Sequence, residues 1–132
     1  MAYATGGIMR TWKIRQTVEF QDWFDEADNK LKESIVEHVE LLRLMGPHLG
    51  RPYADTIKGS SIKNLKELRF NCMEKVIRIF YVFDNERNGL LLIGGNKSSS
   101  RAKRFYEDFI SLSEKIYYKQ LKTTKDQKKN SE

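Results

Sequence analysis

Three cationic side chains interrupt or follow runs of residues that are typical of β-strands. Arg69 and Arg78 lie inside two such runs, and Lys97 follows a third, directly after a glycine-rich stretch. A charge inside a strand that is otherwise suited to burial needs a partner of opposite sign. Guanidinium groups match the oxygens of a phosphate well. If the three strands share one sheet, these cations converge at one end of it and form a site for a phosphodiester.

Arg78 has a second explanation that the sequence leaves open. Strand alternation places Glu67 and Arg69 on one face of their strand, so Glu67 is available as an ion-pair partner for Arg78 on the neighbouring strand. An ion pair in the free protein and phosphate binding in a complex are compatible, because they belong to different states.

Other kinds of chemistry find little support in the residue types present. Neither His38 nor His48 has a cysteine or carboxylate at metal-ligand spacing. His38 falls on the apolar stripe of its helix, which favours a structural role. His48 is expected in an exposed loop. Cys72 is the only cysteine, which excludes an intramolecular disulfide and argues against a cysteine zinc site. The Gly-Gly-Asn-Lys-Ser stretch at residues 94–98 lacks the spacing of a phosphate-binding P-loop. No metal and no cofactor are expected.

The elements that must position these cations follow from the periodicity of the apolar residues. Alternation indicates strands, apolar steps of three and four indicate helices, and an Asn-Gly pair indicates a hairpin turn. The expected elements are a strand at residues 10–20, helices at 21–29 and 31–45, a loop at 46–61, strands at 65–71, 75–84 and 90–96, and a helix at 102–121. The order β-α-α-β-β-β-α predicts an α+β fold, with an antiparallel-rich sheet against which a helical hairpin and a C-terminal helix pack.

Length and composition are consistent with one domain. The chain has 132 residues, 39% of them hydrophobic, and its fifteen aromatic residues suffice for a core. It contains neither an apolar run of the roughly 20 residues that cross a bilayer nor a signal-peptide pattern, so a cytoplasmic location is expected. We expect a loose leader at residues 1–9, the folded domain at 10–121 and a disordered basic tail at 122–132.

The positive charge is concentrated in one part of the chain. Residues 58–104 contain eleven Lys or Arg against four Asp or Glu, whereas residues 1–57 contain seven against nine. A basic excess confined to one segment is typical of proteins that bind a phosphate-rich partner.

Several short motifs then occur in a recognisable order. They are Gly46-Pro47-His48-Leu49-Gly50-Arg51-Pro52, Leu65-Lys66-Glu67-Leu68-Arg69, Val76-Ile77-Arg78-Ile79-Phe80-Tyr81, Leu91-Leu92-Ile93-Gly94-Gly95-Asn96-Lys97-Ser98, Arg104-Phe105-Tyr106 and Glu114-Lys115-Ile116-Tyr117. Together they resemble the phage-derived, HigB-like branch of the RelE/ParE toxin superfamily. The resemblance covers residues 10–121. The family often has an acidic residue where this chain has Asn96, which is a departure from its pattern.

The resemblance implies a RelE-like toxin from a bacterial type II toxin–antitoxin module. Many such toxins enter the ribosomal A site and cleave messenger RNA, and an antitoxin silences them, for HigB-type toxins usually a helix-turn-helix, HigA-like protein. By position, Arg69, Arg78 and Lys97 match the family's catalytic cations. The residues expected to contact RNA are Lys58, Lys66, Tyr81, Arg101 and Tyr106.

The implied reaction needs no metal. The RNA 2′-hydroxyl attacks the adjacent phosphate and gives a cyclic phosphate and a free 5′-hydroxyl. Arg69 and Arg78 would hold the phosphate and offset the charge of the transition state, and Lys97 would act as general base if neighbouring cations lower its pKa. Tyr81 or Tyr106 would stack on a base or move a proton.

Two alternatives share the fold. A ParE-like protein inhibits DNA gyrase by binding and has no nuclease activity, and an inactive relative would act with its antitoxin as a DNA-bound regulator. An exposed apolar C-terminal segment would favour gyrase binding, but the lysine-rich residues after Leu121 do not provide one.

Overall fold

The computed structural model describes residues 10–99 and 101–130. The leader predicted at residues 1–9 lies outside the described residues. The helices and strands are β1 (Lys13–Gln16), α1 (Val18–Asp25), α2 (Asn29–Met45), a 3-10 turn (Gly46–His48), β2 (Ala54–Thr56), β3 (Lys66–Cys72), β4 (Lys75–Phe83), β5 (Asn88–Asn96), a second 3-10 turn (Lys97–Ser99) and α3 (Ala102–Asn130).

One sheet of five strands organises the molecule, in the spatial order β1-β5-β4-β3-β2. The pairs β2–β3, β3–β4 and β4–β5 are antiparallel, and β1 joins β5 in parallel. The predicted α+β class with an antiparallel-rich sheet is therefore confirmed. The structure adds β2, a three-residue edge strand inside the segment that the sequence indicates to be a loop.

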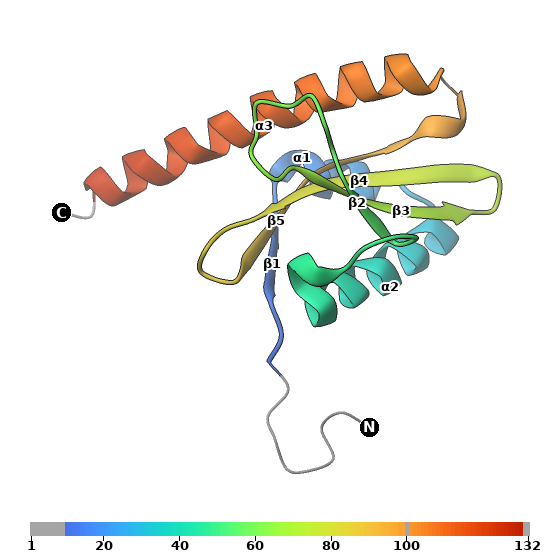
Figure 1. Cartoon of the computed structure of the whole chain (residues 1–132), viewed down its shortest axis with the longest axis horizontal. Coiled ribbons are helices and arrows are strands. Elements are labelled where there is room, and N and C mark those ends of the chain that lie inside the picture. The colour runs from blue at the N-terminus through green and yellow to red at the C-terminus, as the bar shows by residue number, and fades with distance from the viewer. Residues whose placement is uncertain (1–9, 100, 131–132) are drawn as a thin grey trace, which may run out of the picture.

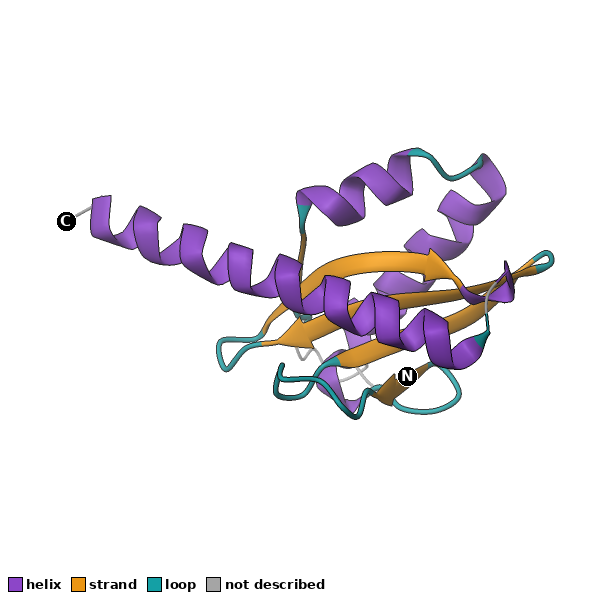
Figure 2. Ribbon diagram, turned by 90° about the horizontal axis from the view of Figure 1, so that it is seen from above, coloured by secondary structure: helices purple, strands orange, loops and turns teal. Residues whose placement is uncertain are grey.

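The helices cover the two faces of the sheet in two layers. The helices α1 and α2 pack on one face, and α3 crosses the other, as Figures 1 and 2 show. On the α2 face the buried core includes Phe20, Leu31, Ile35, Leu42, Leu68, Ile79 and Tyr81. On the α3 face it includes Leu65, Phe80, Val82, Leu92, Phe105 and Ile116. Alternate residues of β4 supply both cores, as strand geometry requires.

The strand predicted at residues 10–20 is shorter than expected, because Thr17 starts a helix. The Thr17 Oγ1 accepts a hydrogen bond of 3.0 Å from the Phe20 amide and donates one of 2.7 Å to the Leu92 carbonyl. The first bond caps α1, and the second ties the cap to β5. Helix α1 therefore begins at Val18, whose side chain is 73% exposed although the alternating pattern predicts burial.

Helix α2 begins and ends close to its predicted limits. The Asp28 carboxylate caps its start by accepting a 2.8 Å hydrogen bond from the Leu31 amide. Gly46 ends it with a φ of 62°, a value that favours glycine. A Cβ on Gly46 would also lie 2.3 Å from the indole of Trp12. Only glycine satisfies both conditions.

Helix α3 continues to Asn130, whereas the sequence predicts an end near Leu121 and a disordered tail from residue 122. No glycine or proline follows residue 121 to stop the helix. The hydroxyls of Thr123 and Thr124 donate 3.1 Å hydrogen bonds to carbonyls one turn earlier. Within the described part of the chain, no helix is both long and apolar enough to cross a membrane.

Candidate functional site

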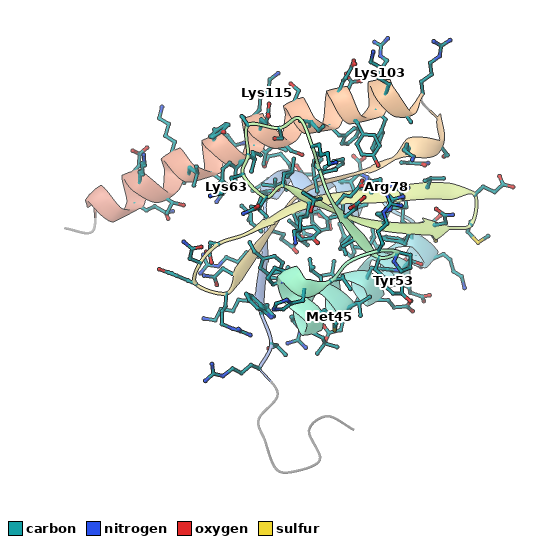
Figure 3. The ribbon with its side chains drawn as sticks, viewed as in Figure 1. Met45, Tyr53, Lys63, Arg78, Lys103 and Lys115 are labelled. Atoms are coloured by element: carbon teal, nitrogen blue, oxygen red, sulfur yellow. The ribbon has the colours of Figure 1, made fainter. Side chains whose placement is uncertain are left out.

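Arg69 and Arg78 are direct neighbours across the β3–β4 ladder, on the face of the sheet that α3 covers. On the other side of β4, Arg78 is paired with Gly95. A Cβ on Gly95 would lie 2.5 Å from the ring of Phe109, so the missing side chain lets α3 lie close to the sheet beside the two arginines. Figure 3 shows Arg78 at the sheet, below the N-terminal half of α3.

A buried carboxylate holds both arginines. Glu67 is only 3% exposed. Its Oε2 accepts a 2.8 Å hydrogen bond from Nη1 of Arg69, and its Oε1 lies 3.6 Å from Nε of Arg78. The ion-pair interpretation of Arg78 is thus confirmed in the free protein. Arg78 also donates to its neighbouring carbonyl, that of Ile77, at 2.9 Å. Phosphate binding by either arginine stays a prediction.

Tyr106 links α3 to the same carboxylate. Its hydroxyl donates a 2.7 Å hydrogen bond to Oε1 of Glu67 and accepts one of 3.3 Å from Nε of Arg78. Burial and the hydrogen bond to Glu67 raise the pKa of Tyr106. The phenol is therefore neutral at physiological pH, and its single O–H is donated to Glu67.

Lys97 completes the cluster from the turn after β5. Its Nζ lies 5.6 Å from the centre of the Tyr106 ring. Burial, followed by the charges of Arg78 and Arg69, lowers the pKa of Lys97, while Glu67 opposes this shift. The structure therefore brings together the three cations predicted to act in catalysis. We call Glu67, Arg69, Arg78, Lys97 and Tyr106 the cationic cluster; its three cations outnumber its one carboxylate.

Asn96 orients the backbone that leads to Lys97. Its Oδ1 accepts hydrogen bonds from the amides of Val76 and Ser98, at 3.1 and 3.0 Å. Asn96 stands where the family pattern often has an acidic residue, and its side-chain oxygen has a structural role. It joins the start of β4 to the turn that carries the lysine.

The residues predicted to contact RNA divide between the two faces of the sheet. A shallow groove of about 500 Å³ borders the cluster between Lys58 and the first turns of α3, and Tyr106 lines it. Arg101 is exposed just before α3. Lys66 instead points to the other side, where its Nζ donates a 2.8 Å hydrogen bond to the Pro47 carbonyl.

Tyr81 is a correction to the predicted site. It is 0% exposed and belongs to the core between the sheet and α2. Burial raises its pKa far above the usual value for tyrosine, and its hydroxyl has no hydrogen-bond partner among the described residues. Strand alternation explains the placement, because Tyr81 follows Phe80 and must face away from Arg78. It cannot stack on a base in this fold.

The histidines lie outside the cluster. His38 stacks on Phe70 with ring centres 4.0 Å apart, and its Nδ1 lies 2.7 Å from the Ser34 carbonyl, in agreement with a structural role. His48 is exposed in the 3-10 turn after α2. Among residues 10–99 and 101–130, no group of three His, Cys, Asp or Glu side chains is placed to hold a metal ion.

The comparisons with known proteins agree with this architecture. The family model described as phage derived protein Gp49-like (DUF891) matches residues 22–118, which is most of the chain. The chain belongs to this family. Within the Gp49-like family region lie all five members of the cationic cluster and the strands β2, β3, β4 and β5.

Two relatives of this Gp49-like protein come from Mycobacterium tuberculosis and are described as toxin candidates. HigB2 is 33% identical over 107 residues, which cover 80% of this chain and 53% of HigB2. HigB3 is 34% identical over 96 residues, which cover 73% of this chain and 82% of HigB3. The Gp49-like chain thus spans about half of HigB2 and most of HigB3, and is homologous to HigB toxins.

Two solved structures share the fold. The toxin–antitoxin complex RelBE2 of M. tuberculosis contains a chain that matches with a TM-score of 0.52 at 12% identity, over 65% of this chain and 98% of the other. A variant of the Escherichia coli toxin RelE in the free state matches with a TM-score of 0.53 at 10% identity, over 68% and 87%. The Gp49-like chain therefore has a RelE-like fold.

Proposed function

We propose that this Gp49-like protein is the toxin of a bacterial type II toxin–antitoxin module and cleaves messenger RNA on the ribosome without a metal. The observation that carries the proposal is the cationic cluster, in which Glu67 holds Arg69 and Arg78 side by side while Lys97 has a lowered pKa. Cations that are held in place before the substrate arrives stabilise a developing phosphorane charge without reorganising. The similarity to HigB2 and HigB3 supports the assignment to a toxin.

In this reaction Arg69 is the first group to meet the phosphate. Its side chain is 21% exposed, compared with 7% for Arg78, so it can bind a non-bridging oxygen from the surface. Arg78 lies behind it and adds positive charge to the site. Neutral Lys97 would take the proton of the attacking 2′-hydroxyl, because its lowered pKa increases the neutral fraction. Neutral Tyr106 would stack on a base, or turn its single O–H from Glu67 to the phosphate.

The partners follow from the same assignment. We propose that the protein acts in the cytoplasm, where it meets ribosomes and messenger RNA. We also propose that a cognate antitoxin silences it, of the helix-turn-helix, HigA-like kind that usually accompanies HigB-type toxins. The RelE-like fold that this chain shares with the RelBE2 complex supports a protein antitoxin. Acidic groups on that antitoxin would complement the positive charge of the cluster.

The proposal is tested by inducing the protein in bacteria while RNA 5′ ends are mapped and DNA supercoiling is measured. We expect cuts that follow the codon period of translated messages, and we expect Arg69→Ala to abolish both the cuts and the arrest of growth. A supercoiling defect without such cuts would instead assign the protein to gyrase inhibition. Retained toxicity in both Arg69→Ala and Arg78→Ala would refute the role of the cationic cluster.

A further inference from the structure

The last part of α3 extends beyond both the family region and the body of the molecule. The Gp49-like match ends at residue 118, whereas α3 continues to Asn130. We call residues 119–130 the arm. Figures 1 and 2 show that it projects past the edge of the sheet, away from the end at which α3 begins.

Contacts with the rest of the molecule fix α3 up to the start of the arm. Glu114 accepts hydrogen bonds from the hydroxyls of Ser60 and Ser61, at 2.9 and 3.0 Å. The Tyr118 hydroxyl lies 3.0 Å from Oγ of Ser61, and Lys119 forms an ion pair with Glu19. The direction of the arm is therefore set by a helix that the loop before β3 and helix α1 hold at the base of the arm.

The arm is basic and lacks apolar side chains after Leu121. Residues 119–130 contain five lysines and one acidic residue, Asp126. Lysines at 119, 122 and 125 follow steps of three, so their positions share one side of the helix. The side chains of Lys122 and Lys125 are exposed. The arm thus presents a row of positive charge on a straight support.

We propose that the arm binds the phosphate backbone of a structured RNA. Clustered lysines on an exposed helix supply the electrostatic attraction that dominates binding to nucleic acid backbones. A protein interface would need apolar or aromatic anchors at its centre, and a membrane-surface helix would need an apolar face. The arm offers neither, since Leu121 at its base, 41% exposed, is its one apolar residue, and residues 122–130 are all polar or charged.

The arm contacts a different part of the RNA from the cationic cluster. Tyr106 and Lys122 are sixteen positions apart on the same helix, which corresponds to about 24 Å along its axis. A distance of this size exceeds the span of a single nucleotide. The arm therefore acts as a second contact that orients the RNA assembly relative to the cluster, and in this respect the inference rests on the proposed function.

The test measures binding of the full-length protein to a labelled, fully paired RNA hairpin over a series of KCl concentrations. Lys122→Gln with Lys125→Gln removes two charges and preserves helix propensity. Lys13→Gln with Lys30→Gln is the matched control, because these exposed lysines lie on β1 and at the start of α2. We expect the arm variant to lose roughly tenfold in affinity and about two units of salt slope, and the control to bind nearly as wild type.

A second arm variant, Lys122→Arg with Lys125→Arg, keeps the charge and is expected to bind as wild type. Three results would each overturn the proposal. The arm and control glutamine variants could lose affinity equally, the salt slope of the arm glutamine variant could be unchanged, or the arginine variant could lose as much affinity as the glutamine variant. So would weakened binding of the cognate antitoxin with unchanged hairpin binding. Hairpin binding needs no cleavage. If the wild-type protein fails to cut messages on the ribosome, the proposed nuclease activity is refuted, but the hairpin assay still tests RNA binding by the arm.

Discussion

The Tyr106 hydroxyl on α3 donates a 2.7 Å hydrogen bond to Oε1 of Glu67 on β3, across the boundary between helix and sheet. The same hydroxyl accepts from Nε of Arg78 at 3.3 Å. The position of the arginine therefore depends on how α3 packs. Each group of this network can be changed with a matched control elsewhere in the chain.

Tyr106→Phe removes one hydroxyl from the network. We expect it to lower the free energy of unfolding by about 2 kcal/mol, because a hydrogen bond to a buried carboxylate is lost. Tyr81→Phe is the control, since the Tyr81 hydroxyl is buried without a partner in the described structure, and we expect it to change stability by less than about 0.5 kcal/mol or to increase it. Urea denaturation measures both. Equal losses would contradict the network.

Glu67→Gln removes the negative charge between two arginines. We expect a loss of about 3 kcal/mol in the free energy of unfolding, because the buried guanidinium of Arg78 and the partly buried guanidinium of Arg69 are left without their counter-charge. Asp55→Asn is the control, because Asp55 pairs with Arg51 in a more exposed position. The aspartate side chain is 36% exposed and the arginine side chain 66%. Such a pair contributes less than about 1 kcal/mol. Similar losses by urea denaturation would show that Glu67 does not organise the cluster.

The pH dependence of cleavage tests Lys97 as the general base. Only its neutral form accepts a proton, so the rate is expected to rise with pH through the lowered pKa of Lys97. Glu67→Gln removes the charge that raises this pKa, so the rise moves to lower pH. Single-turnover cleavage on programmed ribosomes measures the profile; a profile that Glu67→Gln does not move would exclude Lys97 as the base.

Gly95→Ala tests the close approach of α3 to the cluster. The added Cβ would lie 2.5 Å from the ring of Phe109, so we expect a loss of about 1–3 kcal/mol from overpacking together with reduced cleavage. Gly50→Ala is the control, because a Cβ there meets nothing within 4 Å. Thermal unfolding and the cleavage assay compare the two. Wild-type stability in Gly95→Ala would show that α3 does not depend on this contact.

The strands that carry the site were predictable because they are rich in apolar, β-branched and aromatic residues and are bounded by turn residues. Alternation along β3 places Glu67 and Arg69 on one face, and the structure confirms the predicted ion pair of Glu67 with Arg78 and adds one with Arg69. The same rule applied along β4 places Tyr81 and Arg78 on different faces of the sheet. The position of Tyr81 away from the cationic cluster was therefore predictable from the sequence. Residue type suggested RNA stacking for Tyr81, whereas strand geometry excludes it.

Other features depended on contacts between distant residues. The start of α1 depends on Thr17, whose hydroxyl bonds to the carbonyl of Leu92 on another strand. The short strand β2 forms because it pairs with β3. Its three residues are too few to show an alternating pattern in the sequence. The central role of Glu67 could not be predicted, because it depends on the hydrogen bond from Tyr106. Only the packing of α3 on the sheet brings Tyr106 to that position. Sequence periodicity contains none of this information.

The parallel pairing of β1 with β5 has a consequence for the order of folding. Lys13 is paired with Asn88, and Gln16 with Leu91, so the first strand that the ribosome makes has no partner until the last strand has been made. Local antiparallel hairpins form before contacts of long sequence separation. We expect β3, β4 and β5 to assemble first. The residues synthesised earliest in the domain are then among the last to reach their final place.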